Sequence, residues 1–528
     1  MKSKTLFYNG RIYTQANRLR VDSMAIFRNR IVAVGNRLEH DPDFRSYSRY
    51  DLNGLTVVPG MVDAHTHFVF FARTLGFVML DNETSLDACV DKIRLFSRRK
   101  RADEWIIGEG YSPDKFPTRV EPDRHLLDKV TGRRPAFIFS KDQHSAWVNS
   151  RALEIAGIDE RTPDPEGGEI VRFDDGTPSG IVREGPAISL IYNRIPQPTT
   201  KELSRCYAKA LKYAYSKGVT GVHSFDSPEM FSFLSSLAER GALGLRINYY
   251  PQARVLPDLI RQKIKYGTGN EYLRIAGVKV FADGALGSQT ALCFNTYTGS
   301  KDNYGMEVTP VKEMRHIVKE AARLGLPCAI HAIGDRAVSN VLDAFEQSPP
   351  LSSGARHRIE HLQLMRRKDI ARLKRLNVVA SMQPSHCPAD MVMVRRYWGK
   401  RAANAYIFRT LLDRRIDLAF GSDAPIEPID PIAGVAHAVR RAHPGSRDVF
   451  HPEQRITAAE ALHGFTVGPA VAAGQSDCRG YLMPDYPADF AILDKDITQV
   501  APSRIYDIEV LATVLDGQIK HADNSLKL

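Results

Sequence analysis

The chain has 528 residues, 43% hydrophobic and 25% charged, a balance typical of globular proteins. A chain of this length is too long to fold around one small hydrophobic core, so we expect a large α/β domain with a smaller companion domain or a sizeable insertion. The net charge of +11 includes short basic clusters at 98–100 and 372–375, but these lie in helix-like stretches and carry no nucleic-acid-binding motif. We therefore expect no nucleic-acid partner.

Cysteine usage and the first residues indicate the compartment. The six cysteines are scattered and include no C-x-x-C pair, which favours a reducing environment over a disulfide framework. The opening segment MKSKTLFYNGRIYTQ lacks the apolar core of a signal peptide, and no run approaches the length of a membrane span. We expect a cytoplasmic protein with no membrane partner.

Both ends of the chain carry short β-type segments separated by turns. They occur at 5–15, 23–35 and 49–58 and again at 487–496 and 506–521. This shared pattern of short β segments predicts that residues 1–58 and 475–528 together build one small sheet domain.

Residues 59–474 alternate apolar strand-like segments with amphipathic helix-like stretches, as in ELSRCYAKALKYAYSKG and VKEMRHIVKEAARLG. This alternation predicts a parallel sheet, most economically a (β/α)8 barrel of the TIM type. The strand candidates are 55–67, 134–140, 218–226, 245–251, 274–284, 326–334, 356–363, 377–385 and 416–424. Nine candidates exceed eight positions, and 245–251 is the least secure.

Residues 76 to about 200 are too long for one βα loop. They contain a Pro/Gly/Asp-rich stretch at 162–180 that is typical of a hairpin. We predict an insertion after the first strand that covers the mouth of the barrel.

The motif GMVDAHTHF places His65 and His67 two residues apart, so their side chains point to the same side of a strand. An isolated H-x-H is a weak signal, but His331, His361 and Asp423 each follow another short apolar strand. Imidazole and carboxylate suit Zn²⁺, with Mn²⁺, Fe²⁺ or Co²⁺ as competitors. The set predicts a metal site at the carboxyl ends of the strands, where barrel enzymes place their chemistry.

A lysine, Lys279, interrupts the apolar strand segment GVKVFADG. A lysine is almost never fully buried without a partner. From the residues alone it is a solvated edge residue, an ion-pair partner of Asp283, or a chemically altered side chain.

Five segments together resemble the amidohydrolase superfamily: GMVDAHTH, VKVFADGALGSQTA, IHAIGDRAV, RIEHLQ and FGSDAPIEPIDP. The likeness is to the amidohydrolase family 3 branch, with its N-substituted formamide deformylase-like and exoenzyme-regulatory-protein-like hydrolases, and it covers essentially the whole chain. It implies a metal-dependent barrel, a composite β-sandwich built from both termini, and hydrolysis of C–N bonds in amides, formamides or cyclic amides of small molecules. Members often dimerise, so it also allows a homodimer.

The resemblance also implies roles for the candidate residues. His65, His67 and Asp423 would bind one Zn²⁺, His331 and His361 a second, and Lys279, carboxylated by CO2, would bridge the two. A single metal with an unmodified Lys279 is the alternative. Asp423 would also act as the catalytic proton shuttle.

Further residues are candidates for substrate contact. The segment KDQHSAWVNS is similar to a family segment, so His144 and Trp147 are predicted to line the pocket, although Trp147 fits a core position equally well. His223 and His386 end strand segments and are either substrate contacts or nearby hydrogen-bonding groups. Asp335 would orient His331 or cap the following helix.

Other functions remain open at this point. The same metal site could hydrolyse esters or phosphoesters, because pocket shape decides the scissile bond. A regulatory or binding protein without catalysis is the non-enzymatic alternative, although every expected metal-binding position is filled.

Overall fold

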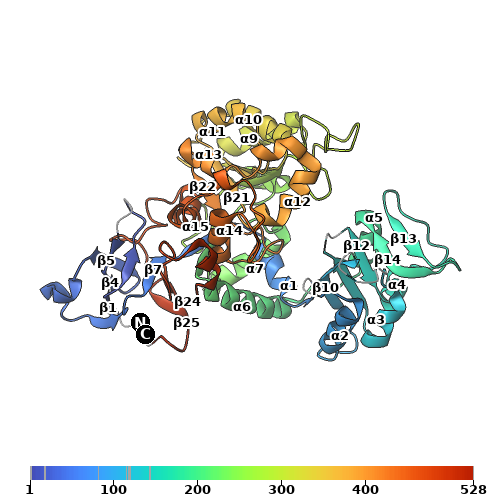
Figure 1. The fold of residues 1–528 in the computed structure, drawn as a ribbon, viewed down its shortest axis with the longest axis horizontal. Coiled ribbons are helices and arrows are strands. Elements are labelled where there is room, and N and C mark those ends of the chain that lie inside the picture. Colours follow the sequence, from blue (N-terminus) through green and yellow to red (C-terminus); the bar gives the residue numbers. More distant parts are fainter. Residues whose placement is uncertain are drawn as a thin grey trace. The chain divides into compact units, whose positions relative to one another are not determined.

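The computed structural model describes residues 3–16, 20–80, 83–113, 116, 121–141 and 144–526. It divides into two compact units, Met1–Phe71 with Ala208–Leu528, and Ala72–Tyr207 (Figure 1). The second unit is slightly wider than the insertion predicted at 76–200. The first unit contains both the barrel-like part and the sheets from the chain ends.

The barrel-like part consists of parallel strands in two sheets. One has the order β17-β16-β15-β8 and the other runs β18-β19-β20-β21-β22. Isolated parallel bridges, Thr66 to Ala424 and Gln252 to Lys279, link the two sheets. The fold is α/β and TIM-barrel-like, although strand pairing among the described residues does not form one uninterrupted ring. The strands are β8 (Met61–Thr66), β15 (Val219–Ser224), β16 (Arg246–Tyr249), β17 (Leu273–Ile275), β18 (Val278–Phe281), β19 (Cys328–Ala332), β20 (Arg358–His361), β21 (Val379–Met382) and β22 (Leu418–Phe420).

The strand predicted at 274–284 is divided into β17 and β18 around Gly277. A Cβ at Gly277 would lie 2.5 Å from the carbonyl oxygen of Pro327 and 2.8 Å from the ring of Tyr250. A larger residue therefore does not fit where the strand changes partners from β16 to β19.

Amphipathic helices separate these strands. In α9 the buried residues Met314, Ile317, Val318 and Ala321 recur at helical spacing. The helices of this part are α6 (Thr200–Ser216), α7 (Pro228–Glu239), α8 (Leu256–Arg261), α9 (Val311–Arg323), α10 (Asp335–Glu346), α11 (Ile370–Arg375), α12 (His386–Trp398), α13 (Phe408–Asp413), α14 (Pro431–Arg440) and α15 (Ala458–Ala472).

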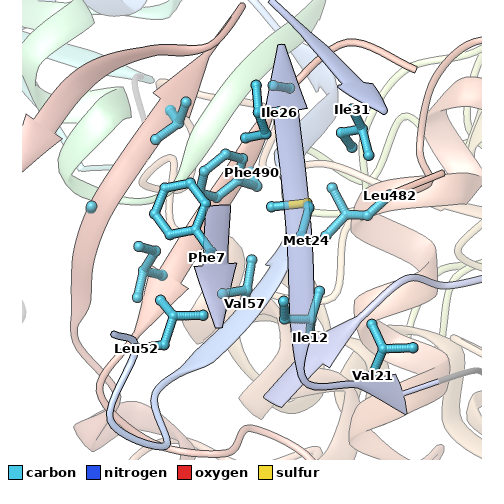
Figure 2. Close-up of a cluster of buried hydrophobic side chains, with 14 residues drawn as sticks. Phe7, Ile12, Val21, Met24, Ile26, Ile31, Leu52, Val57, Leu482 and Phe490 are labelled. Atoms are coloured by element: carbon cyan, nitrogen blue, oxygen red, sulfur yellow. The ribbon is translucent and has the colours of Figure 1, made fainter. Parts of the chain in front are cut away.

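The two chain ends contribute to a common sheet. A six-stranded sheet has the order β25-β24-β23-β7-β2-β3, and a four-stranded sheet has the order β5-β4-β1-β6. Phe7, Met24, Val57 and Phe490 belong to the buried cluster drawn in Figure 2, with Phe7 and Phe490 5.4 Å apart between ring centroids. The strands are β1 (Lys4–Tyr8), β2 (Arg11–Tyr13), β3 (Arg20–Val21), β4 (Ser23–Phe27), β5 (Arg30–Gly35), β6 (Ser48–Asp51), β7 (Thr56–Pro59), β23 (Phe490–Leu493), β24 (Val510–Leu515) and β25 (Gln518–Ala522).

The second unit has its own six-stranded sheet, ordered β13-β14-β12-β11-β10-β9. The candidate strand 134–140 lies here as β11, so its assignment to the barrel was wrong, whereas 245–251 contains the barrel strand β16. An apolar run shows that a strand is buried on both faces but not which sheet it joins. The elements are β9 (Val78–Met79), β10 (Ile106–Tyr111), β11 (Ala136–Ser140), β12 (Ser145–Val148), the hairpin β13 (Glu169–Arg172) and β14 (Pro178–Arg183), α2 (Leu86–Ser97), α3 (Arg124–Thr131), α4 (Ser150–Ala156) and α5 (Glu184–Tyr192), with α1 (Phe68–Thr74) leading in.

Among the described residues, no helix combines the length and the apolarity needed to cross a bilayer. All six cysteines are free thiols.

Candidate metal centre

His65 and His67 stand at the carboxyl end of β8, and backbone hydrogen bonds bring Asp423 beside them. The Asp423 amide donates to the carbonyl of His65 at 2.7 Å, and the His67 amide donates to the carbonyl of Ala424 at 2.9 Å. Oδ1 of Asp423 consequently lies 3.5 Å from Nε2 of His65 and 3.7 Å from Nε2 of His67. The first and last strands of the barrel-like part thus place three predicted ligands together.

The close packing of β8 and β22 depends on small and polar residues. A Cβ at Gly421 would lie 2.3 Å from the amide nitrogen of His65. The buried carboxylate of Asp63 accepts from the amide and hydroxyl of Ser422 and from the amide of His65. These contacts hold Asp423 with a left-handed φ of 62°, a conformation that costs a non-glycine residue energy and is typical of functional sites.

His331 and His361 come from the ends of β19 and β20. Their ring centroids are 4.4 Å apart, and the ring of His361 is 4.9 Å from that of His65. His361 also has a left-handed φ, 70°. Potential ligand atoms of His65, His361 and Asp423 all lie within 4.8 Å of one another.

Lys279 lies on β18, the neighbour of the strand β19 that carries His331, and is 1% exposed. Its Nζ has no hydrogen-bond partner among the described residues and lies 4.5 Å from the ring centroid of Phe225. Asp283 is held elsewhere, because its carboxylate accepts from the amides of Leu292, Ile333 and Gly334. Lys279 is therefore neither a solvated edge residue nor the partner of Asp283.

A buried charged network missed by the sequence analysis supports His65. Oε2 of Glu360 accepts from Nδ1 of His65 at 2.6 Å and from Nη2 of Arg358 at 2.9 Å. Arg358 also donates to the carbonyl of Ala64 and to Oγ of Ser381. Two charged residues two apart in an otherwise apolar strand, in the motif RIEH, were the signal that could have identified this pair.

Burial sets the protonation of the site. It lowers the pKa of His67 to about 4 and that of His331 to about 3, helped by the nearby Lys279 charge, and it lowers the pKa of His65 and His361 well below the usual range of a histidine. All four imidazoles are thus neutral at pH 7, the form that binds metals. Burial also raises the pKa of Asp423 to about 7 and lowers that of Lys279 to about 8.

His386 and His223 occupy different environments. His386 begins α12, and its buried Nε2 lies 4.0 Å from Oδ2 of Asp423 without a hydrogen-bond partner among the described residues. His223 is 1% exposed, and its Nδ1 accepts from Nη1 of Arg358 at 2.7 Å. His386 therefore borders the metal centre, whereas His223 belongs to the network behind it.

His144 and Trp147 lie in the second unit. His144 is half exposed and its Nδ1 lies 3.1 Å from a carboxylate oxygen of Glu184. Trp147 is fully buried in the core, and its Nε1 donates to the carbonyl of Asp123 at 2.8 Å. Asp335, in the first turn of α10, accepts from the amide of Phe294.

The side chains present fit divalent metal ions. Neutral imidazoles and a carboxylate are the donors that Zn²⁺ and similar ions take, and the ligand atoms converge. Nζ of Lys279 and Nδ1 of His361 are buried without hydrogen-bond partners, which is unusual for polar atoms unless they bind something.

A sequence model of the amidohydrolase family matches residues 49–521. The chain belongs to this family. The amidohydrolase is 30% identical to the putative amidohydrolase YtcJ of Bacillus subtilis strain 168, over 98% of this chain and 99% of the relative. It is 26% identical to the N-substituted formamide deformylase of Arthrobacter pascens, over 89% of each chain.

Solved structures extend the likeness. The structure of an uncharacterized metal-dependent hydrolase from Pyrococcus furiosus superposes on this chain with a TM-score of 0.79 and 30% sequence identity. The match covers 94% of this chain and 100% of that hydrolase. The atrazine chlorohydrolase TrzN from Arthrobacter aurescens TC1, complexed with zinc, shares the fold alone, with a TM-score of 0.52 and 14% identity over 98% of this chain and 95% of that chain. The amidohydrolase is thus a metal-dependent hydrolase with a TIM-barrel-like fold.

Proposed function

We propose that this amidohydrolase cleaves a C–N bond, in an amide, an N-formyl group or a cyclic amide, of a small molecule. The observation that carries the proposal is the convergence of His65, His361 and Asp423 within 4.8 Å, beside a buried Lys279 whose Nζ has no hydrogen-bond partner among the described residues. The family and the similarity to a protein named for formamide deformylation support the choice of bond.

Two ions, Zn²⁺ or the competing Mn²⁺, Fe²⁺ or Co²⁺, would be held by six side chains. When bound, they supply Lewis acidity that polarises a carbonyl and lowers the pKa of a water molecule. One ion would be held by His65, His67 and Asp423, the other by His331 and His361, with a carboxylated Lys279 shared between them.

The protein's own groups would then move the protons. Asp423 borders both His65 and His67, so its carboxylate can accept a proton from the attacking water and return it to the leaving nitrogen. Nε2 of His386 lies 4.0 Å from the same carboxylate and can hydrogen-bond the substrate there. Glu360 holds His65 by Nδ1, which leaves Nε2 directed to the centre.

The burial of Lys279 supports its proposed carboxylation. Burial lowers the pKa of the ammonium, so part of the population carries a neutral amine at pH 8. The neutral nitrogen would attack the carbon of CO2, so that one N–C bond forms and one C–O π bond breaks with its electron pair moving to oxygen. An N–H proton then passes to water, and the product is a carbamate anion. This exchanges a buried cation for an anion that bound dications neutralise.

The modification is tested by NMR with ¹³C-bicarbonate. The zinc-loaded protein should show a carbamate carbonyl signal that disappears in Lys279→Ala. A Lys279→Ala protein that keeps full metal content and activity would rule out the modification while leaving the hydrolase proposal standing.

The scissile bond is tested with a panel of N-acyl amines, N-formyl amines, cyclic amides, esters and phosphoesters. We expect turnover within the first three classes that Asp423→Asn abolishes. The exposed residue Asp413 provides a matched control, because Asp413→Asn should leave turnover unchanged. Turnover of esters or phosphoesters alone would assign the other hydrolysis, and no turnover by the metal-loaded protein would favour a binding protein.

A further inference from the structure

A cavity lies at the amino-terminal ends of three barrel strands, whereas His65, His331 and His361 lie at the carboxyl ends of theirs. It is lined by residues at the starts of β8, β15 and β16 and by the segment 475–489. It measures about 630 Å³ including the solvent at its mouth. Because one water takes about 30 Å³ of liquid volume, the cavity has room for a group of several non-hydrogen atoms.

Three arginines line this cavity against two carboxylates. Arg246 comes from β16, Arg274 from β17 and Arg479 from the later segment, and the carboxylates are Glu271 and Asp489. Asp489 is committed to Arg246, whose Nε donates to its Oδ2 at 2.6 Å. Outside the lining, Asp516 also accepts from Nη2 of Arg246.

Glu271 does not satisfy the remaining donors. It is 55% exposed, and its Oε2 lies 3.6 Å from both Nη1 of Arg246 and Nη2 of Arg479, beyond hydrogen-bond distance. Its other oxygen lies 3.3 Å from the exposed Arg30. The cavity lining therefore holds three guanidinium groups against two carboxylates, one of which also contacts Arg30.

Buried polar atoms of three lining residues have no hydrogen-bond partners among the described residues. They are Nη1 of Arg246, Nε of Arg274 and Oδ1 of Asn248. The side chain of Arg246 is only 8% exposed. Buried donors are nearly always paired, and leaving one unpaired is costly, most of all for a charged group.

We propose that this cavity binds a small oxyanion, a phosphate or carboxylate group, held by Arg246, Arg274 and Arg479. The planar guanidinium matches such oxygens with paired hydrogen bonds. Burial and the neighbouring charge of Arg246 lower the pKa of Arg479, so a bound anion would relieve repulsion between the two cations. The site is separate from the metal centre and would join the starts of the barrel strands to the segment 475–489.

Calorimetric titration of the full-length, metal-loaded protein tests the site, with inorganic phosphate and acetate as the probes at constant ionic strength. We expect saturable binding of at least one of them. Its affinity should fall at least tenfold in Arg274→Gln and in Arg479→Gln, with metal content and circular dichroism unchanged. Arg261 supplies the matched control, because it is 72% exposed and Arg261→Gln should bind as the unaltered chain does.

The results separate this site from its alternatives. Equal affinity in all four proteins would place the anion outside this cavity and overturn the proposal. No saturation by either probe up to about 10 mM would also overturn it and leave the arginines as counter-ions of Glu271 and Asp489. The probe whose binding depends on Arg274 and Arg479 identifies the oxyanion as phosphate or carboxylate.

Discussion

Replacing Glu360 by Gln tests whether the buried network behind His65 supports the metal centre. Glu360 is fully buried and accepts from His65 and twice from Arg358, itself fully buried. Gln has nearly the same shape but no charge, and its amide nitrogen cannot accept a hydrogen bond. The substitution therefore leaves the guanidinium without its counter-charge and removes one acceptor.

The expected magnitude follows from burial. Removing one partner of a buried ion pair costs about 3–5 kcal/mol of stability. Losing the group that orients a ligating imidazole weakens metal binding about 10–100-fold. By contrast, Asp417 pairs with Arg356 at 2.6 Å but is 45% exposed, so Asp417→Asn should cost less than about 1 kcal/mol.

Urea denaturation of the metal-free proteins and competition with a chelator measure the two effects. The double variant Arg358→Met/Glu360→Gln removes both buried charges, so it should regain part of the lost stability without regaining metal affinity. If Glu360→Gln unfolds at the same urea concentration as Asp417→Asn and keeps its zinc affinity, the network does not support the centre.

Three further predictions follow from burial and close contact. Gly421→Ala should lower turnover about 100-fold, because the new Cβ would meet the amide of His65 and displace Asp423. Steady-state kinetics of a variant with a normal circular dichroism spectrum checks this, and unchanged kinetics would refute the close approach. Trp147→Ala should lower the free energy of unfolding by about 3–5 kcal/mol, and Trp147→Phe should lower it much less. The KM of the folded Trp147→Phe protein should be unchanged, and a raised KM would instead support the predicted pocket role of Trp147. Removal of bound metal by a chelator should lower the unfolding temperature, and Zn²⁺ should restore it, because the unpaired buried atoms of Lys279 and His361 gain partners on binding. An unchanged unfolding temperature would argue against a bound ion.

The sequence was informative where chemistry-bearing residues follow apolar strands. The spacing of His65 and His67, and the positions of His331, His361 and Asp423 after later strands, predicted their grouping because parallel strands end at one edge. The apolar surroundings of Lys279 left three environments open, from a solvated edge to a buried and altered side chain, and only the structure shows that the residue is buried.

Other features depend on tertiary contacts that no local pattern encodes. The run 134–140 is as apolar as a barrel strand but pairs within the second unit as β11. His223 ends its strand like the metal ligands, yet it contacts Arg358 because of how β15 and β20 face one another across the core. The role of Glu360 depends on its contact with His65, which comes from a distant part of the chain, so the motif RIEH alone does not specify it.

Metal analysis of the protein after reconstitution with Zn²⁺ and bicarbonate tests the central claim most directly. A centre built from His65, His67, Lys279, His331, His361 and Asp423 should retain about two equivalents of zinc per chain, and Lys279→Ala should retain less. Fewer than about half an equivalent in the unaltered protein would contradict a metal centre made of these residues.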